Sequence, residues 1–337
     1  MVITTQLIMD GGKLKSKNNI LIGLALVIVF AIAYAVYQSS SAQLNSNNTY
    51  STNSSQALGT NTRVLHIVAA ENFWGSLMSQ LCGIHCNVTS MVTDPNADPH
   101  EYEASAYDAR EISNANIVII NGVGYDEWAL KLTSASNNPN RTIINVGALL
   151  GLQNGTNPHL WYNPKYVNAT VKQMYGDLVL ADPQNSKYYS LRYAALNASL
   201  AQVDGKMAQI KGQFAGTKIA STESVSVYLA NATGLDLISP PSFMNSVSEG
   251  VDPPSQSIAV FENQLESGNV SVLIYNEQTI TPLTDQMKQI AAQNNITAVG
   301  VTETIQPPNT SYQTWMNSEL LNLQNALYKS ELDKKRA

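Results

Sequence analysis

Residues 182–214 read "DPQNSKYYSLRYAALNASLAQVDGKMAQIKGQF", and this stretch decides the fold. Asp182 can cap a helix, and Pro183 suits its first turn. Apolar residues then recur at alternating spacings of four and three, so they form one stripe along a helix of about nine turns. The stripe consists of Leu196, Leu200, Val203, Met207, Ile210 and Phe214. A helix of this length predicts a stiff strut between two other parts of the chain.

On both sides of this helix, short β-branched runs alternate with helical stretches. Four strands are predicted before it, at 63–70, 87–93, 116–122 and 142–146, and four after it, at 217–222, 235–239, 271–276 and 297–302. Such alternation is typical of parallel sheets covered by helices. We therefore predict an α/β fold of two Rossmann-like lobes with parallel sheets, at 63–181 and 215–330, joined by the rigid helix 182–214.

The N-terminal region predicts export. Residues 20–37 are apolar and follow three lysines, which favours a membrane anchor that leaves 1–19 in the cytoplasm. A cleaved signal peptide is the alternative. No cysteine directly follows residues 20–37, so the usual bacterial lipid anchor is not expected. Residues 38–62 are rich in Ser, Asn and Thr and predict a disordered tether. The lobes are then extracytoplasmic, held at the cell membrane by the anchor or secreted after cleavage.

Composition excludes some functions. The chain is 44% hydrophobic, which is a globular composition, and its net charge of −6 offers no basic surface for nucleic acid.

Cys82 and Cys86 are the two cysteines. In an exported protein a C-x3-C pair is most simply a disulfide, although His85 between them leaves a metal site as an alternative.

Two of the four histidines stand out, because His100 and His159 each follow a proline. In parallel sheets, ligands bind beyond the carboxyl ends of the strands. His100 follows the strand 87–93, Glu223 follows 217–222 and Glu303 follows 297–302, while His159 precedes the start of a helix. These four side chains are expected to converge in the cleft between the lobes.

Two imidazoles and two carboxylates are a suitable ligand set for a divalent transition metal, with zinc or manganese favoured and iron third. Asp98 and Glu101 flank His100 and could orient its ring, while Glu249 and Glu277 are competing carboxylates. His66 lies in an apolar strand and is predicted to be a core residue.

The chain resembles the substrate-binding proteins of zinc, manganese and iron ABC importers. The phrases that carry the resemblance occur in family order over roughly 63–330; they include "ENFWGSL", "DPNADPHEYEAS", "NGVGYDEW", "NPHLWYNP", "STESVSVYLANATGL" and "YNEQTITPLTDQM". The resemblance places the family's metal ligands on His100, His159, Glu223 and Glu303. The family usually has aspartate at the last position, so Glu303 is a departure.

The resemblance implies a receptor, a monomer and not an enzyme, that delivers its metal ion to an ABC permease and its ATPase. Zinc is slightly ahead of manganese as the ion, because affinity order favours zinc, whereas two carboxylates make the site harder. Two other functions stay open, a surface-anchored adhesion or metal-sensing protein and an exported metalloenzyme. The enzyme would need an open coordination position and a separate base, and the sequence has no HExxH motif.

Overall fold

The computed structural model describes residues 64–96, 98–136 and 138–336. The segments predicted as cytoplasmic, anchor and tether, residues 1–62, lie outside the described residues. All eight predicted strands are present: β1 (Leu65–Glu71), β2 (Cys86–Val92), β3 (Ile117–Ile120), β4 (Thr142–Asn145), β5 (Lys218–Ser221), β6 (Asp236–Leu237), β7 (Val272–Asn276) and β8 (Thr297–Val301). None of the helices formed by the described residues has the length and apolarity needed to cross a membrane.

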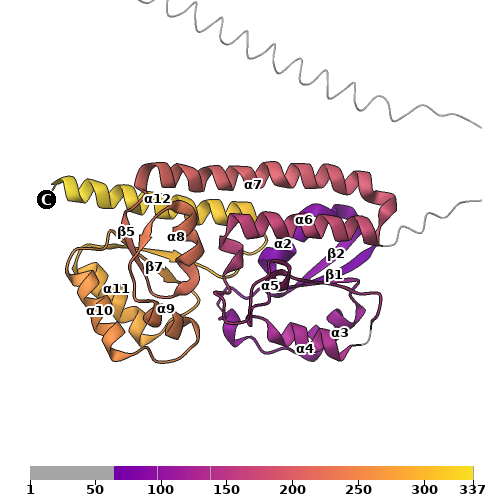
Figure 1. The fold of residues 1–337 in the computed structure, drawn as a ribbon, viewed down its shortest axis with the longest axis horizontal. Helices are drawn as coiled ribbons and strands as arrows, with labels where there is room; N and C mark the ends of the chain where they lie inside the picture. Colours follow the sequence, from indigo (N-terminus) through magenta and orange to yellow (C-terminus); the bar gives the residue numbers. More distant parts are fainter. Residues whose placement is uncertain (1–63, 97, 137, 337) are drawn as a thin grey trace, which may run out of the picture. The chain divides into compact units, whose positions relative to one another are not determined.

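The strands form two parallel four-stranded sheets with the same topology, and their orders are β2-β1-β3-β4 and β6-β5-β7-β8. The first lobe has the helices α2 (Asn72–Cys82), α3 (Ala106–Asn114), α4 (Glu127–Ala135), α5 (Val146–Leu149) and α6 (Pro164–Ala181). The second has α8 (Val227–Thr233), α9 (Pro241–Ser248), α10 (Ser255–Glu266) and α11 (Pro282–Gln293). The predicted α/β class with two lobes is confirmed (Figure 1).

The long helix predicted between the lobes is α7 (Ser186–Phe214). It begins four residues later than predicted, because Pro183–Asn185 form a separate 3-10 turn. Its buried residues are the six of the predicted apolar stripe together with Tyr189. The periodicity of the sequence therefore identified the face that packs against the lobes.

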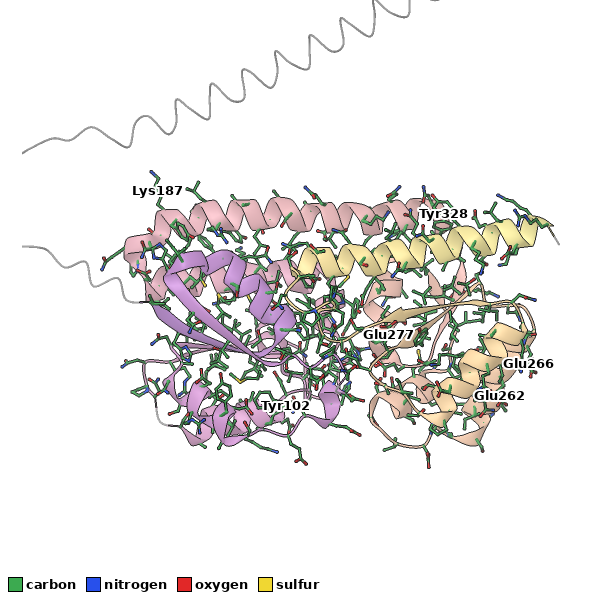
Figure 2. The ribbon with its side chains drawn as sticks, turned by 180° about the vertical axis from the view of Figure 1, so that it is seen from behind. Tyr102, Lys187, Glu262, Glu266, Glu277 and Tyr328 are labelled. Carbon is green, nitrogen blue, oxygen red and sulfur yellow. The ribbon has the colours of Figure 1, made fainter. Side chains whose placement is uncertain are left out.

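A second long helix, α12 (Tyr312–Arg336), runs beside α7 and also links the lobes (Figure 1). At its start, the Tyr312 hydroxyl donates to the Trp161 carbonyl of the first lobe at 2.6 Å. Further along, the Tyr328 hydroxyl donates to Gln213 of α7 at 2.8 Å (Figure 2). The sequence analysis did not predict this second link, which adds to the stiffness of the pair of lobes.

The largest hydrophobic core is continuous across both lobes. It includes Ile67 of β1, Val171 of α6, Leu200 of α7, Val272 of β7 and Leu320 of α12. Two smaller clusters lie on the other faces of the two sheets. Because close-packed cores resist deformation, the strand ends of one lobe are held at a defined distance from those of the other.

Candidate metal site

His100 lies in a short 3-10 turn, Pro99–Glu101, that follows β2. Asp98 starts the turn and its Oδ1 accepts a hydrogen bond from the His100 backbone N–H at 2.9 Å. The His100 ring packs edge-on against Tyr125, with ring centroids 4.8 Å apart. The Pro-His pair in the acidic loop thus holds one imidazole at the carboxyl end of the sheet, with 21% of its side chain exposed.

His159 is fully buried, and one hydrogen bond sets its tautomer. Asn157 Oδ1 accepts from the His159 backbone N–H and lies 2.8 Å from the ring Nδ1. The amide of Asn157 donates to the Ser224 carbonyl, so its oxygen must face the histidine. The proton therefore sits on Nδ1, and the lone pair of Nε2 is available to a metal.

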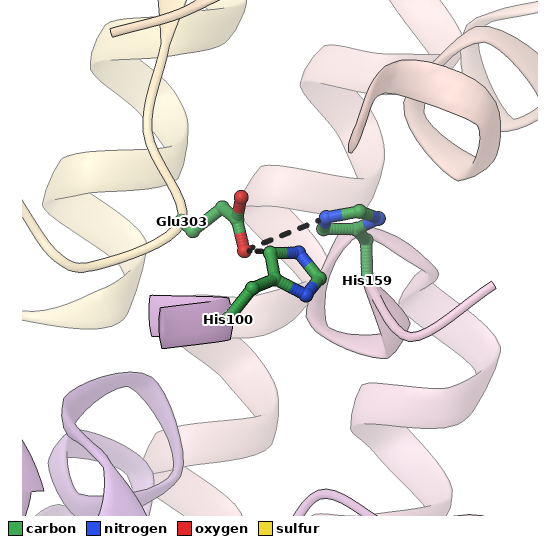
Figure 3. Close-up of side chains that lie close together, drawn as sticks. All are labelled: His100, His159 and Glu303. Atoms are coloured by element: carbon green, nitrogen blue, oxygen red, sulfur yellow. Dashed lines mark ion pairs between the residues drawn. The ribbon is translucent and has the colours of Figure 1, made fainter. Parts of the chain in front are cut away.

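Glu303 faces both imidazoles (Figure 3). Its Oε2 lies 3.4 Å from His100 Nε2 and 3.5 Å from His159 Nε2, and it accepts a hydrogen bond of 2.7 Å from the Tyr125 hydroxyl. The ligand atoms of the two histidines and Glu303 all lie within 4.8 Å of one another, and no other such group occurs in the described residues. This spacing suits one ion bound between three side chains.

Glu223 is the fourth predicted ligand and lies at the margin of this cluster. Its Oε1 is 4.0 Å from His159 Nε2, and its Oε2 is buried without a hydrogen-bond partner among the described residues. The Asn276 amide, at the end of β7, donates to Oε1 of Glu223 at 2.9 Å and to Oε1 of Glu303 at 2.6 Å. An unpartnered oxygen in the interior is costly, which favours a cation beside it.

The ionisable groups of the site shift one another's pKa values. Burial alone would lower the pKa of His100, but Glu303, Asp98 and Glu223 outweigh it and raise the pKa to about 9. Burial would raise the pKa of Glu303, yet the two histidines hold it well below its usual range. Burial and Glu303 raise the pKa of Glu223 to about 8. Without an ion, the site at neutral pH therefore pairs a charged His100 with the Glu303 carboxylate.

Burial lowers the pKa of His159, so this ring is neutral at neutral pH. A neutral imidazole is the form that binds metal. The site thus has one imidazole ready to bind and one that must first release a proton.

The other predicted residues take different roles. Asp98 holds the backbone of His100, not its ring, and its Oδ2 accepts from the Thr279 hydroxyl of the second lobe at 3.2 Å. Glu101, Glu249 and Glu277 are exposed and do not join the cluster; Glu277 is labelled in Figure 2. Residues of both lobes, Asp98, Glu101 and Gly250 among them, line two cavities of about 580 and 680 Å³ beside the site.

One prediction needs correction and one stays open. Cys82 and Cys86 are free cysteines in the described chain, and the disulfide suggested by the C-x3-C spacing stays a prediction. The two thiols contact each other, and a hydrogen bond from Cys82 raises the pKa of Cys86. His66 is only half-buried and pairs with Glu111 at 3.1 Å, although Val68 and Ala70 on the same face of β1 are buried.

Two residues of the site, Tyr125 and Asn276, were missed. Tyr125 is buried in the loop after β3, where Gly122 has a φ of +78° and donates its N–H to Asp126 Oδ1 at 2.8 Å. Asn276 ends β7 and is 2% exposed. Both follow the rule that site residues cluster at strand ends, which could have identified them.

Comparison with known proteins gives a consistent picture. The sequence model of the family described as zinc-uptake complex component A, periplasmic (ZnuA) matches residues 67–326. A manganese-binding lipoprotein, MntA of Halalkalibacterium halodurans, is 30% identical over 128 residues, which are 37% of this chain and 42% of that protein. A high-affinity zinc uptake system protein, ZnuA of Bacillus subtilis, is 21% identical over 69% of this chain and 78% of its own length.

Solved structures share the fold. A mutant of the laminin-binding adhesin Lmb from Streptococcus agalactiae superposes with a TM-score of 0.67 at 16% identity, covering 78% of this chain and 99% of that one. At that identity the likeness shows the fold alone.

Proposed function

This chain belongs to the family of the periplasmic zinc-uptake component A, ZnuA, and from that membership we propose that it is an extracytoplasmic receptor for one divalent transition metal ion. It delivers this ion, as its substrate, to the permease of an ABC importer. The observation that carries the proposal is the convergence of two imidazole nitrogens and one carboxylate oxygen from the two lobes within 4.8 Å.

In this proposal His100 and His159 bind the ion through Nε2, and Glu303 binds it through Oε2. Glu223 completes the set by moving its carboxylate toward His159. The ion replaces the protons of His100 and Glu223 and compensates the charge of both carboxylates, so binding releases protons. A buried, four-ligand set of this kind suits zinc best, manganese next and iron third.

Receptor function is favoured over catalysis. Four protein ligands leave no coordination position for an activated water, whereas hydrolytic zinc sites keep one. We therefore propose that the chain is not an enzyme.

The arrangement of the chain fits delivery. We propose that residues 20–37 anchor a monomer to the membrane and that 38–62 tether the lobes, 63–181 and 215–330, close to the permease and its ATPase. A tether raises the effective concentration of the receptor at its partner. Adhesion by an anchored surface protein is the alternative, and one neighbour of the same fold is named a laminin-binding adhesin.

The experiment is a calorimetric titration of the full chain, stripped with chelator, with Zn²⁺ and with Mn²⁺ in separate runs. We expect one ion per chain, and His159→Ala should weaken zinc binding about 100-fold or more. His85→Ala is the matched control, because His85 packs on Tyr188 away from the site. Tight binding that survives His159→Ala would refute the proposed site.

A further inference from the structure

Asn276 stands between the two carboxylates of the site. In the second sheet, β7 lies between β5 and β8, which lead to Glu223 and Glu303 respectively. Asn276 is the last residue of β7 and pairs with Val301 of β8. Its side chain is therefore placed by the sheet itself at the edge where both glutamates emerge.

The orientation of this amide is fixed. Asn276 Oδ1 accepts a hydrogen bond from the Gln278 backbone N–H at 2.9 Å, so the NH2 group must face the glutamates. An amide has two N–H donors, and the Asn276 Nδ2 has three acceptors to share them: Oε1 of Glu223 at 2.9 Å, Oε1 of Glu303 at 2.6 Å and Oγ1 of Thr279 at 2.9 Å. One uncharged group thus ties two acidic side chains together.

This arrangement occupies one oxygen of each glutamate. For Glu303, Oε1 is tied to Asn276 and Oε2 faces the histidines. For Glu223, Oε1 is tied to Asn276 and is also the oxygen that lies 4.0 Å from His159 Nε2, while the buried Oε2 has no hydrogen-bond partner in the part of the chain that the structure describes. To bind an ion through both oxygens, either glutamate would have to turn Oε1 away from the Asn276 amide.

We propose that Asn276 is a positioning residue that sets metal specificity by limiting Glu303 to one metal-bound oxygen, Oε2, and by holding Glu223 Oε1 on the side of His159. With two imidazoles, two single oxygens make a four-coordinate site, which is the geometry that zinc prefers. Manganese favours six ligands, which bidentate carboxylates would help to supply. The inference rests on the proposed function, and it deepens it by naming zinc-like ions as the preferred substrate class.

The test compares the full chain with Asn276→Leu and Asn276→Asp. The leucine removes both N–H donors, and the aspartate keeps the size and the acceptor for Gln278 but also loses the donors. Gln324→Leu is the matched control, because Gln324 is a buried amide bonded to Lys206 and Gln213 in the same lobe, away from the site.

Two quantities are measured. The first is the ratio of the Mn²⁺ and Zn²⁺ dissociation constants, which should fall at least about tenfold in both Asn276 variants and stay unchanged in Gln324→Leu. The second is the visible absorption of bound Co²⁺, which is strong for four-coordinate and weak for six-coordinate ions. We expect strong absorption in the wild type and weak absorption in the variants.

Asn276→Asp alone decides the matter if the leucine variant fails to fold. A ratio within about threefold of the wild type in a folded variant, or weak Co²⁺ absorption in the wild type, would overturn this inference while leaving the receptor function intact. Failure of the receptor function looks different, since the wild type would then bind neither ion or would bind it independently of His159.

Discussion

The two lobes share one sheet topology but contribute opposite kinds of ligand. The first lobe supplies two imidazoles from loops, and one of them, His100, is partly exposed. The second lobe supplies two carboxylates, both fully buried, at the ends of β5 and β8. Buried like charges repel each other, so the acidic half of the site, Glu223 and Glu303, needs a built-in partner. The histidine half, His100 and His159, needs the correct tautomer of His159 and the release of a proton from His100.

The difference indicates how the work of binding is divided. The Asn276 amide holds the carboxylates in place before an ion arrives, while the His100 charge compensates Glu303 in its absence. Neither lobe holds a complete site, and the shared core around α7 and α12 keeps the halves together. The comparison predicts that substitutions of the buried glutamates, Glu223 and Glu303, weaken zinc binding most.

The largest effect is expected for Glu303→Gln. The variant keeps the size of the side chain but loses the charge that faces both imidazoles, so zinc affinity should fall about 100- to 1,000-fold, or roughly 3–4 kcal/mol. Competition with a chelating dye measures it. Glu262→Gln is the control, because Glu262 is a glutamate of the same lobe bonded to Gln286 on the surface (Figure 2). An equal loss in both variants would contradict the special role of Glu303.

The next effect concerns pH in the metal-free protein. Despite its burial, His100 has a pKa raised to about 9 by Glu303 and its neighbours, so its charged form stabilises the fold. This contribution is complete below pH 6.5 and is lost as pH rises through 9, so the free energy of unfolding should fall by at most about 3 kcal/mol. Ionisation of Glu223, with its pKa near 8, acts in the same direction.

Urea unfolding in the presence of chelator, between pH 6 and 9.5, tests this. His100→Ala should flatten the curve, and saturating zinc should reverse its slope, because deprotonated ligands bind the ion more tightly. If the free energy of unfolding of the metal-free protein instead rises over this pH range, the charge of His100 does not compensate the Glu303 carboxylate.

A smaller effect is expected for Tyr125→Phe. The Tyr125 hydroxyl donates to the same Glu303 oxygen that faces the histidines, at 2.7 Å, and so helps to aim it. Loss of one hydrogen bond to a charged group should cost about 1.5 kcal/mol, or about tenfold in zinc affinity. Tyr166→Phe is the control for the substitution itself, because that ring packs on Tyr228 away from the cluster. Unchanged zinc affinity in Tyr125→Phe would show that the Tyr125 hydroxyl does not help to position Glu303.

Much of this arrangement was predictable, for physical reasons that differ between residues. The strands and α7 follow from the period of their apolar residues, which reports burial directly. His100 and His159 could be found because histidine is scarce and strand ends are where parallel sheets bind ligands. Tyr125 and Asn276 also follow strands, but they were missed because tyrosine and asparagine are common in this chain and their partners lie far away in sequence.

The carboxylates were the hardest to rank. Glu223, Glu249, Glu277 and Glu303 all lie in or beside loops of the second lobe, and sequence alone cannot tell which are buried. Only packing separates them: Glu223 and Glu303 are fully enclosed, and the other two are exposed. Cys82 and Cys86 are a similar case, since their spacing shows that the two thiols are close and says nothing about their oxidation.

The smallest effect is therefore expected for the exposed competitors, and it sharpens the contrast between the lobes. Glu249→Gln and Glu277→Gln remove charges beside the two cavities, where water and salt screen them. Zinc affinity should change less than about threefold in either variant. The binding rate at low salt should fall more than the affinity does, because surface charge steers cations. If Glu249→Gln weakened zinc binding as much as Glu303→Gln, a surface loop would supply one of the carboxylates that bind the ion. Positioning of Glu223 and Glu303 by Asn276 would then not be needed.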